Sequence, residues 1–167
     1  MPDMLVKLYE LPKVEPILQL MEEQNISIRL GIPPEKHVVL DWIGEYFGEA
    51  WVSEADVAFS QKPSTIYLAI DQEKQQLVGF GCFETTCKGF FGPTGVHPDY
   101  RGRDIGKALL LACLHGLANL GYAYGVIGGA GPVEFYRKVV GATEIPDSVP
   151  GIYRGMLRRN APTPNQD

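Results

Sequence analysis

The feature that most constrains the fold is a turn rich in glycine and arginine that joins a strand-like segment to a long, apolar, helix-like one. The turn covers residues 96–108 and reads VHPDYRGRDIGKA. The first N–H groups of a helix have no partner within it, the helix dipole is positive at that end, and glycines let an anion approach the backbone closely. The sequence therefore predicts an anion-binding helix N-terminus, to which Arg101, Arg103 and Lys107 add positive charge.

The same turn allows a plainer interpretation, and two other phosphate motifs do not fit this chain. In the plainer interpretation Asp104 is the N-cap of an ordinary helix and the arginines are solvated. A Walker loop is excluded because Gly102 and Gly106 enclose three residues instead of four, and alanine follows the lysine. The later glycines of residues 125–131 do not have the spacing of a Rossmann turn.

Hydrophobic periodicity predicts an alternation of strands and helices. Alternating apolar residues and high β-propensity predict strands at residues 4–10, 65–70, 76–85, 90–96 and 122–127. Helical spacing, with proline near the starts and glycine near the ends, predicts helices at residues 14–24, 33–48, 105–120 and 133–140. Residues 49–63 carry a mixed pattern without a firm assignment. Residues 143–157 form a return rich in proline and glycine that can hold the last strands.

Length and composition indicate one globular domain. A chain of 167 residues is long enough for one full core and too short for two ordinary domains. We expect a single domain at residues 1–157 and a disordered polar tail at residues 158–167. The hydrophobic share of 45% is that of a globular protein. A net charge of −5 argues against a broad electrostatic grip on nucleic acid or on an anionic membrane.

No segment of the sequence indicates export, a membrane span or a metal site. No apolar run reaches the roughly 18 residues of a span, and the N-terminus lacks a basic start followed by an apolar stretch, so we expect a cytoplasmic protein. Cys82, Cys87 and Cys113 have no CxxC or zinc-ligand spacing, which indicates reduced, mostly buried thiols. A nucleophilic Cys82 or Cys87 is the alternative, although the sequence places no histidine beside either.

The turn and its surroundings resemble a known enzyme family. The pattern Arg101-x-x-Asp104-x-Gly106 is similar to the Gln/Arg-x-x-Gly-x-Gly/Ala signature of the GNAT (GCN5-related) N-acetyltransferases. The resemblance extends over residues 65–142 and includes the helix to Leu120 and the Phe135-Tyr136 pair. It implies an α+β fold with a mixed, mainly antiparallel central sheet and helices on both faces, that is, three α/β/α layers.

The resemblance also implies a cofactor site. Acetyl-CoA would be the co-substrate, without a metal. The backbone of Thr94, Gly95 and Val96 would run along pantetheine. The N–H groups around the pyrophosphate would be those of Arg101, Gly102, Arg103, Asp104, Ile105, Gly106 and Lys107.

The activity that the resemblance implies is transfer of an acetyl group to a primary amine of a small molecule or a protein, by direct attack in a ternary complex. Tyr136 aligns with the tyrosine that protonates the departing thiolate, and a phenol of unperturbed pKa near ~10 is neutral at pH 7 and can donate that proton. We expect Glu84 to act as the base, directly or through water. His97 and His115 are weaker candidates. The family also suggests a homodimer.

Two departures from the family pattern leave a second function open. Asp104 stands where the family usually has glycine, and its carboxylate could compete with the pyrophosphate for N–H donors. Gly129 stands where many relatives have an asparagine that touches the cofactor. The second function is therefore a CoA-binding module without catalysis. A third, a nucleotide binder that uses the same loop, would bind ATP but not CoA.

Overall fold

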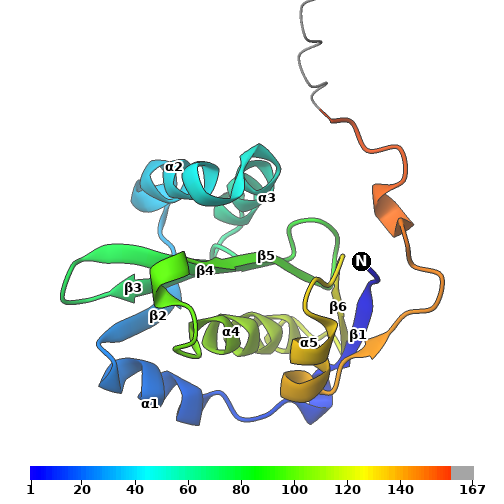
Figure 1. The fold of residues 1–167 in the computed structure, drawn as a ribbon, viewed down its shortest axis with the longest axis horizontal. Coiled ribbons are helices and arrows are strands. Elements are labelled where there is room, and N and C mark those ends of the chain that lie inside the picture. Colours follow the sequence, from blue (N-terminus) through cyan, green and yellow to red (C-terminus); the bar gives the residue numbers. More distant parts are fainter. Residues whose placement is uncertain (159–167) are drawn as a thin grey trace, which may run out of the picture.

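Within residues 1–158 seven strands form one mixed sheet, and the N-terminal strand lies inside it. The computed structural model describes residues 1–158 (Figure 1). The sheet order is β2-β3-β4-β5-β6-β1-β7, in which β5 and β6 are parallel and the other neighbours antiparallel. The strands are β1 (Met4–Lys7), β2 (Ile26–Leu30), β3 (Ile66–Asp71), β4 (Gln76–Phe83), β5 (Phe90–Val96), β6 (Tyr124–Ile127) and β7 (Thr143–Glu144).

Helices cover both faces of this sheet. In Figure 1 α2 and α3 form an upper layer, and α1, α4 and α5 lie below the strands. The helices are α1 (Glu15–Glu23), α2 (Lys36–Phe47), α3 (Glu49–Ser60), α4 (Ile105–Asn119) and α5 (Val133–Val140). Short 3-10 turns are found at Leu8–Glu10, Pro33–Glu35, Pro98–Tyr100 and Gly151–Tyr153. The predicted three-layer α+β architecture is therefore confirmed.

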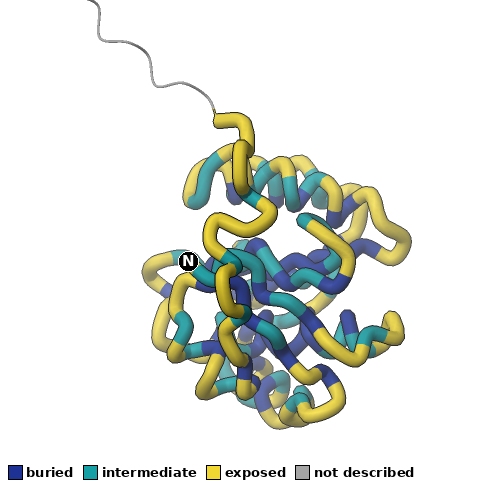
Figure 2. Tube along the Cα trace, turned by 90° about the vertical axis from the view of Figure 1, so that its right-hand side faces the viewer, coloured by how far each residue is buried: buried dark blue, intermediate teal, exposed yellow. Residues whose placement is uncertain are grey.

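Each face of the sheet has its own core. Figure 2 shows that the buried residues lie in the interior of the molecule and the exposed ones around it. On the lower face α4 is buried around nearly its whole circumference, as expected for a helix that is apolar on all sides. On the upper face the fully buried Phe80 of β4 packs among the aromatic rings of Trp42, Phe47 and Trp51. The sheet is therefore fixed from both sides, which makes β4 and β5 rigid supports for a site.

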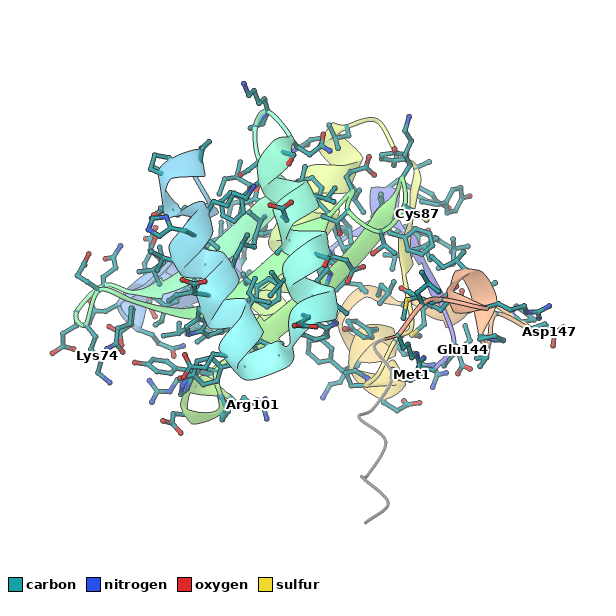
Figure 3. The ribbon with its side chains drawn as sticks, turned by 90° about the horizontal axis from the view of Figure 1, so that it is seen from above. Met1, Lys74, Cys87, Arg101, Glu144 and Asp147 are labelled. Carbon is teal, nitrogen blue, oxygen red and sulfur yellow. The ribbon has the colours of Figure 1, made fainter. Side chains whose placement is uncertain are left out.

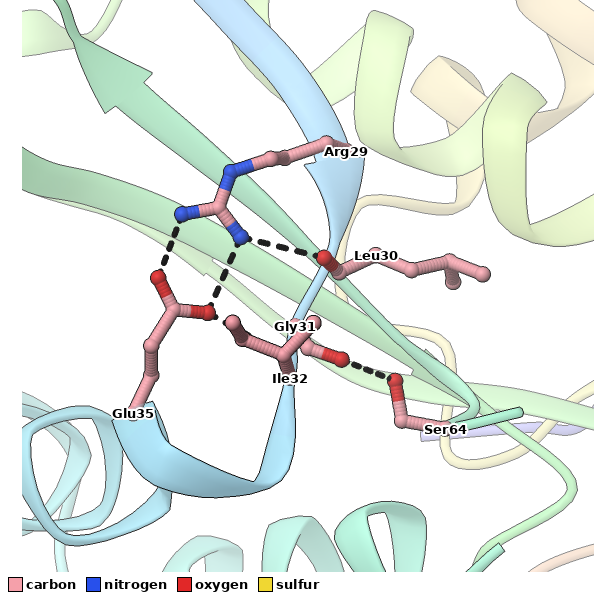
Figure 4. Close-up of polar contacts among 6 residues, drawn as sticks. All are labelled: Arg29, Leu30, Gly31, Ile32, Glu35 and Ser64. Carbon is pink, nitrogen blue, oxygen red and sulfur yellow. Dashed lines mark hydrogen bonds and ion pairs between the residues drawn. The ribbon is translucent and has the colours of Figure 1, made fainter. Parts of the chain in front are cut away.

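An ion pair fixes the entry of the chain into the upper layer (Figure 4). Arg29 of β2 donates to Glu35 through two nitrogens, one of them at 2.9 Å, and Glu35 also accepts from the N–H of Ile32 at 3.0 Å. The hydrogen bond from Arg29 holds the pKa of Glu35 below its usual range. Close by, Ser64 donates to the carbonyl of Gly31 at 2.5 Å. These contacts tie the start of α2 to the edge of the sheet.

Three local predictions differ from the structure. The predicted strand at residues 4–10 ends at Lys7, and a 3-10 turn follows. The sequence analysis missed β2, although Ile26, Ile28 and Leu30 alternate with polar residues. The unassigned residues 49–63 contain α3, whose inward face includes two alanines that weaken the apolar signal. The predicted tail lies outside the described residues, except for Arg158.

No helix within residues 1–158 is both long enough and apolar enough to cross a membrane.

Candidate functional site

The site begins at the point where β5 and β6 separate. The space between the two strands beyond this point is called the strand gap. These strands pair only at Phe90 with Val126 and at Phe91 with Ile127, whereas β5 continues to Val96. The N–H of His97 donates to Val78 of β4 at 2.8 Å. Because backbone groups alternate in direction along a strand, those of Thr94 and Val96 point away from β4 and into the gap. The carbonyl of Val96 accepts from the side chain of Arg101 at 3.3 Å. This edge has no partner strand, so the strand gap offers it to an extended ligand.

A β-bulge lies at the strand gap. The register between β4 and β5 shifts by one residue between the Gly81–Thr94 and Phe83–Phe91 pairs. Bulges re-aim side chains and are common beside functional sites. Here the bulge turns Phe91 to the lower face and Gly95 to the upper face, where a Cβ on Gly95 would lie only 2.5 Å from the ring of Phe47. Glycine at 95 therefore allows α2 to pack directly on β5.

Beyond Val96 the chain forms the predicted helix N-terminus, and residues 101–107 are called the anion loop. Asp104 has a φ of 61°, in the left-handed region that aspartate tolerates better than most residues. The first helical bond runs from the N–H of Ala108 to the carbonyl of Asp104, at 3.0 Å. The N–H groups of Ile105, Gly106 and Lys107 lie before that bond and have no helical partner. They are the donors that an anion would use.

The carboxylate of Asp104 does not compete for these donors. The residue occupies the N-cap position, but its side chain makes no capping hydrogen bond and is exposed. The plainer interpretation, in which Asp104 caps an ordinary helix, is therefore wrong for its side chain. The backbone of Asp104 is left-handed, a conformation that glycine adopts easily and that aspartate also tolerates. Aspartate can therefore stand where the family usually has glycine.

An open depression of about 250 Å³ lies over the anion loop. Its basic members belong to the loop, and its apolar members come from β5, α4 and α5. The lining residues are Val96, Tyr100, Arg101, Gly102, Asp104, Ile105, Gly106, Lys107 and Phe135. A basic and N–H-rich wall beside apolar side chains suits a ligand that carries phosphate on an otherwise partly apolar body.

Tyr100, which the sequence analysis did not assign a role, anchors the anion loop. Its hydroxyl donates to Asp71 at 2.6 Å and accepts from Lys74 at 3.2 Å, so it joins the loop to the turn between β3 and β4. The hydrogen bond from Tyr100, followed by that from the N–H of Lys74, holds the pKa of Asp71 below its usual range. The guanidinium of Arg103 lies 4.9 Å from the centre of the Tyr100 ring. Figure 3 shows Lys74 and Arg101 on one side of the molecule, away from Cys87.

Tyr136 lies below the point at which the strands separate. It is on α5, is 7% exposed and packs edge-on against Phe91 of β5, with ring centres 6.3 Å apart. Burial raises the pKa of Tyr136. The phenol is therefore neutral at pH 7, as a proton donor must be.

The sequence analysis placed Glu84 on the strand at residues 76–85, but β4 ends at Phe83 and Glu84 lies in the turn between β4 and β5. One oxygen of its carboxylate accepts from the N–H of Gly89, and the other accepts from the hydroxyl of Tyr122 at 3.1 Å. Both oxygens thus close the turn. The role of Glu84 as a base, directly or through water, stays a prediction.

The other reactive side chains have structural contacts. His97 accepts from the N–H of Asp99 at 3.2 Å, and a ring nitrogen of His115 lies 2.9 Å from the carbonyl of Pro12. All three cysteines are free, with Cys87 exposed and the other two buried. Burial raises the pKa of Cys82, which opposes a nucleophilic role there. Within residues 1–158 no three His, Cys, Asp or Glu side chains gather as metal ligands would.

The sheet, the strand gap and the anion loop together define a GNAT-type acetyltransferase fold. The model of the acetyltransferase (GNAT) family matches residues 36–142, more than half of the sequence, and the chain belongs to this family. The resemblance noted in the sequence is thereby confirmed. A comparison with curated proteins finds no match.

Solved structures share the fold at low sequence identity. A GCN5-related glucosamine N-acetyltransferase region of a fungal multi-domain β-N-acetylglucosaminidase has a TM-score of 0.70 at 15% identity, over 86% of this chain and 19% of that one. A GCN5-related N-acetyltransferase from Sphaerobacter thermophilus has a TM-score of 0.66 at 22% identity, over 86% and 48%. A Drosophila protein has a TM-score of 0.59 at 14% identity, over 86% and 47%. The chain thus spans between a fifth and a half of the length of these structures.

Proposed function

We propose that the chain transfers an acetyl group from acetyl-CoA to a primary amine. The observation that carries this proposal is the path of the chain, in which β5 runs from the strand gap to Val96 and one short 3-10 turn, Pro98–Tyr100, connects it to the anion loop. An extended thioester bound along the edge of Thr94 and Val96, which has no partner strand, would reach the anion loop with its phosphates. Its acyl end would then lie near the point where β5 and β6 separate.

The residues present fit the CoA part of such a ligand. The N–H groups that precede the first helical bond and the exposed Arg101 and Arg103 suit a pyrophosphate. Val96 and Phe135 supply apolar surface in the same depression. The carboxylate of Asp104 makes no capping hydrogen bond, which leaves the N–H donors to a phosphate.

The reaction proposed is direct attack in a ternary complex. The lone pair of the neutral amine forms a bond to the thioester carbonyl carbon, whose oxygen would be stabilised by N–H groups of β5. The C–S bond then breaks, its electron pair stays with sulfur, and Tyr136 supplies the proton that converts the thiolate to the thiol. The amine loses its own proton to a carboxylate, for which Glu84 is the predicted group. Positioning of both reactants supplies a large part of the rate.

Calorimetry and a thiol assay test the proposed function together. Native protein is expected to bind acetyl-CoA and to release free CoA thiol only when an amine is added. Binding without amine-dependent release, over a panel of primary amines and peptide N-termini, would favour the non-catalytic CoA-binding module. Binding of ATP without binding of CoA would favour the nucleotide binder. A cytoplasmic location and a homodimer stay predictions.

The predicted base is tested by Glu84→Gln. If Glu84 takes the proton of the amine, kcat should fall at least about tenfold and the acid limb of its pH profile should flatten, because an amide cannot accept that proton. Tyr122→Phe is the matched control, since it removes a contact of the turn and keeps the carboxylate. Equal, pH-independent losses in both variants would restrict Glu84 to closing the turn.

A further inference from the structure

A second tyrosine lies at the strand gap, on the face opposite Tyr136. A Cβ placed on Gly128, the first residue after β6, would lie 3.0 Å from the hydroxyl oxygen of Tyr153 and 3.0 Å from the ring of Phe90. Tyr136 packs on Phe91, the next residue of β5, and side chains of adjacent strand residues point to opposite faces. The point where the strands separate thus has one phenol below the sheet and one above it.

Tyr153 is delivered by residues 145–157, which we call the C-terminal strap. The strap is fixed to Asp3, the residue before β1. The carbonyl of Asp3 accepts from the N–H of Ile145, and its N–H donates to Ser148, both at 2.8 Å. The carboxylate of Asp3 accepts from the N–H of Gly129 at 2.8 Å. Asp3 therefore holds both the C-terminal strap and the Gly128–Gly129 segment beside Tyr153. These contacts fix the position of Tyr153. Figure 1 shows the strap rising past β1 toward the upper layer.

A carboxylate of the upper layer reaches the same place. Glu54 of α3 is partly buried and accepts a hydrogen bond from the hydroxyl of Thr86. The neighbouring Thr85 donates to the carbonyl of Gly92 at 2.8 Å, and Gly92 is the first residue of β5 beyond its last pair with β6. Burial, and next the negative charge of Glu54, raises the pKa of Tyr153. Glu54 and Tyr153 thus lie within electrostatic reach of each other above the strand gap.

We propose that Glu54 and Tyr153 bind the ammonium group of the acetyl acceptor on the upper face of the sheet. The inference rests on the proposed function and names the acceptor class as primary alkylamines that are cationic when they bind. An ammonium group has three N–H donors and no acceptor. A free carboxylate oxygen and a phenol oxygen can accept two of them, and the face of a tyrosine ring adds cation–π attraction. The amine would approach from above, and the proton for sulfur would come from Tyr136 below.

The position of Glu54 also favours an acceptor with an apolar body. Trp51 precedes Glu54 by three residues, so the two side chains lie on the same face of α3. Trp51 is partly buried and stacks on Phe47, which covers Gly95 of β5. An alkyl or aryl group attached to the ammonium carbon can therefore extend along this aromatic surface. A neutral alcohol of the same shape would make this aromatic contact but could not form the ion pair with Glu54.

The test uses 2-phenylethylamine and its neutral isostere 2-phenylethanol, titrated into 15N-labelled full-length protein and followed by amide chemical shifts. In the native protein the amine should shift the amides of Glu54, Thr86, Gly128 and Gly129 and bind at least about tenfold more tightly than the alcohol. Glu54→Gln should weaken amine binding at least about tenfold and leave alcohol binding unchanged. Asp41→Asn, which removes one exposed carboxylate from α2 in the same layer, should leave both unchanged.

Equal binding of amine and alcohol, native affinity in Glu54→Gln, or shifts confined to another face would each overturn the inference. Acetyl-CoA is titrated into the same samples, and Glu54→Gln should bind it like the native protein. Amine binding that depends on Glu54 without any binding of acetyl-CoA would contradict the proposed function and leave the ammonium site standing. Acetyl-CoA binding without amine binding would overturn the ammonium site and leave the proposed acetyl-CoA site standing.

Discussion

Replacing Arg103 and Gly106 together by glutamate will weaken acetyl-CoA binding at least about 100-fold. One substitution reverses a charge of the anion loop, and the other adds a carboxylate in the first turn of α4, where the free N–H groups lie. A like charge about 4 Å from a phosphate costs about 1 to 4 kcal/mol, depending on the local dielectric. Two such charges are therefore enough for a loss of about two orders of magnitude. Isothermal titration calorimetry measures the change.

The double variant should remain folded, which makes the loss interpretable. A Cβ at Gly106 meets only Val96, at 3.8 Å, and Arg103 is exposed. Glutamate has a better helix propensity than glycine, and a negative charge in the first turn interacts favourably with the helix dipole. The unfolding midpoint should therefore stay the same or rise. The matched control is the double glutamine variant, which has a similar shape and should lose less affinity. Equal losses in the two variants would show a steric rather than an electrostatic effect.

Replacing Tyr136 by phenylalanine will lower kcat about 100-fold and leave acetyl-CoA binding unchanged. Phenylalanine keeps the ring that packs on Phe91 and Phe135 and removes only the hydroxyl that we propose donates the proton. Because burial raises the pKa of Tyr136 above its ordinary value near ~10, the native phenol keeps its proton at neutral and mildly alkaline pH. The native kcat should fall as the pH rises through that raised pKa, and this fall should be absent from the variant. The readout is amine-dependent release of CoA thiol.

A kcat within twofold of the native value would remove Tyr136 from the reaction. Phe135→Leu is a useful control, since Phe135 lines the depression over the anion loop and contacts the Tyr136 ring. It should change acetyl-CoA affinity more than kcat. A kcat loss in the leucine variant as large as that in Tyr136→Phe would indicate that displacement of α5, rather than loss of a proton, slows the reaction.

The parts of the fold that follow local patterns could be predicted from the sequence. The strands β3, β4 and β5 and the helix α4 have strong periodicity and turns between them, and the anion loop has an informative spacing of glycines and basic residues. The missed strand β2 had a clear alternation, but it is short and pairs with β3, which begins 36 residues after it. The helix α3 had helical spacing that two alanines diluted.

The parts of the site that depend on distant contacts could not be predicted. Tyr100 meets Asp71, 29 positions away, and Asp3 meets Gly129, 126 positions away. Local periodicity carries no information on such pairs. The bulge in β5 reverses which face Gly95 occupies, so a strict alternation from Phe91 would place it wrongly. The ammonium site proposed at Glu54 and Tyr153 is of this kind, because these residues are 99 positions apart and the negative charge of Glu54 reaches Tyr153 only in the folded chain.

The central claim is that acetyl-CoA lies along β5 with its phosphates on the anion loop, and an acetyl-CoA titration of 15N-labelled native protein followed by amide chemical shifts tests it most directly. We predict saturable shifts that are largest at Thr94, Val96, Ile105, Gly106 and Lys107, with small changes at the turn between β4 and β5. Shifts that are absent at millimolar acetyl-CoA, or that are confined to residues remote from β5 and the start of α4, would contradict the account.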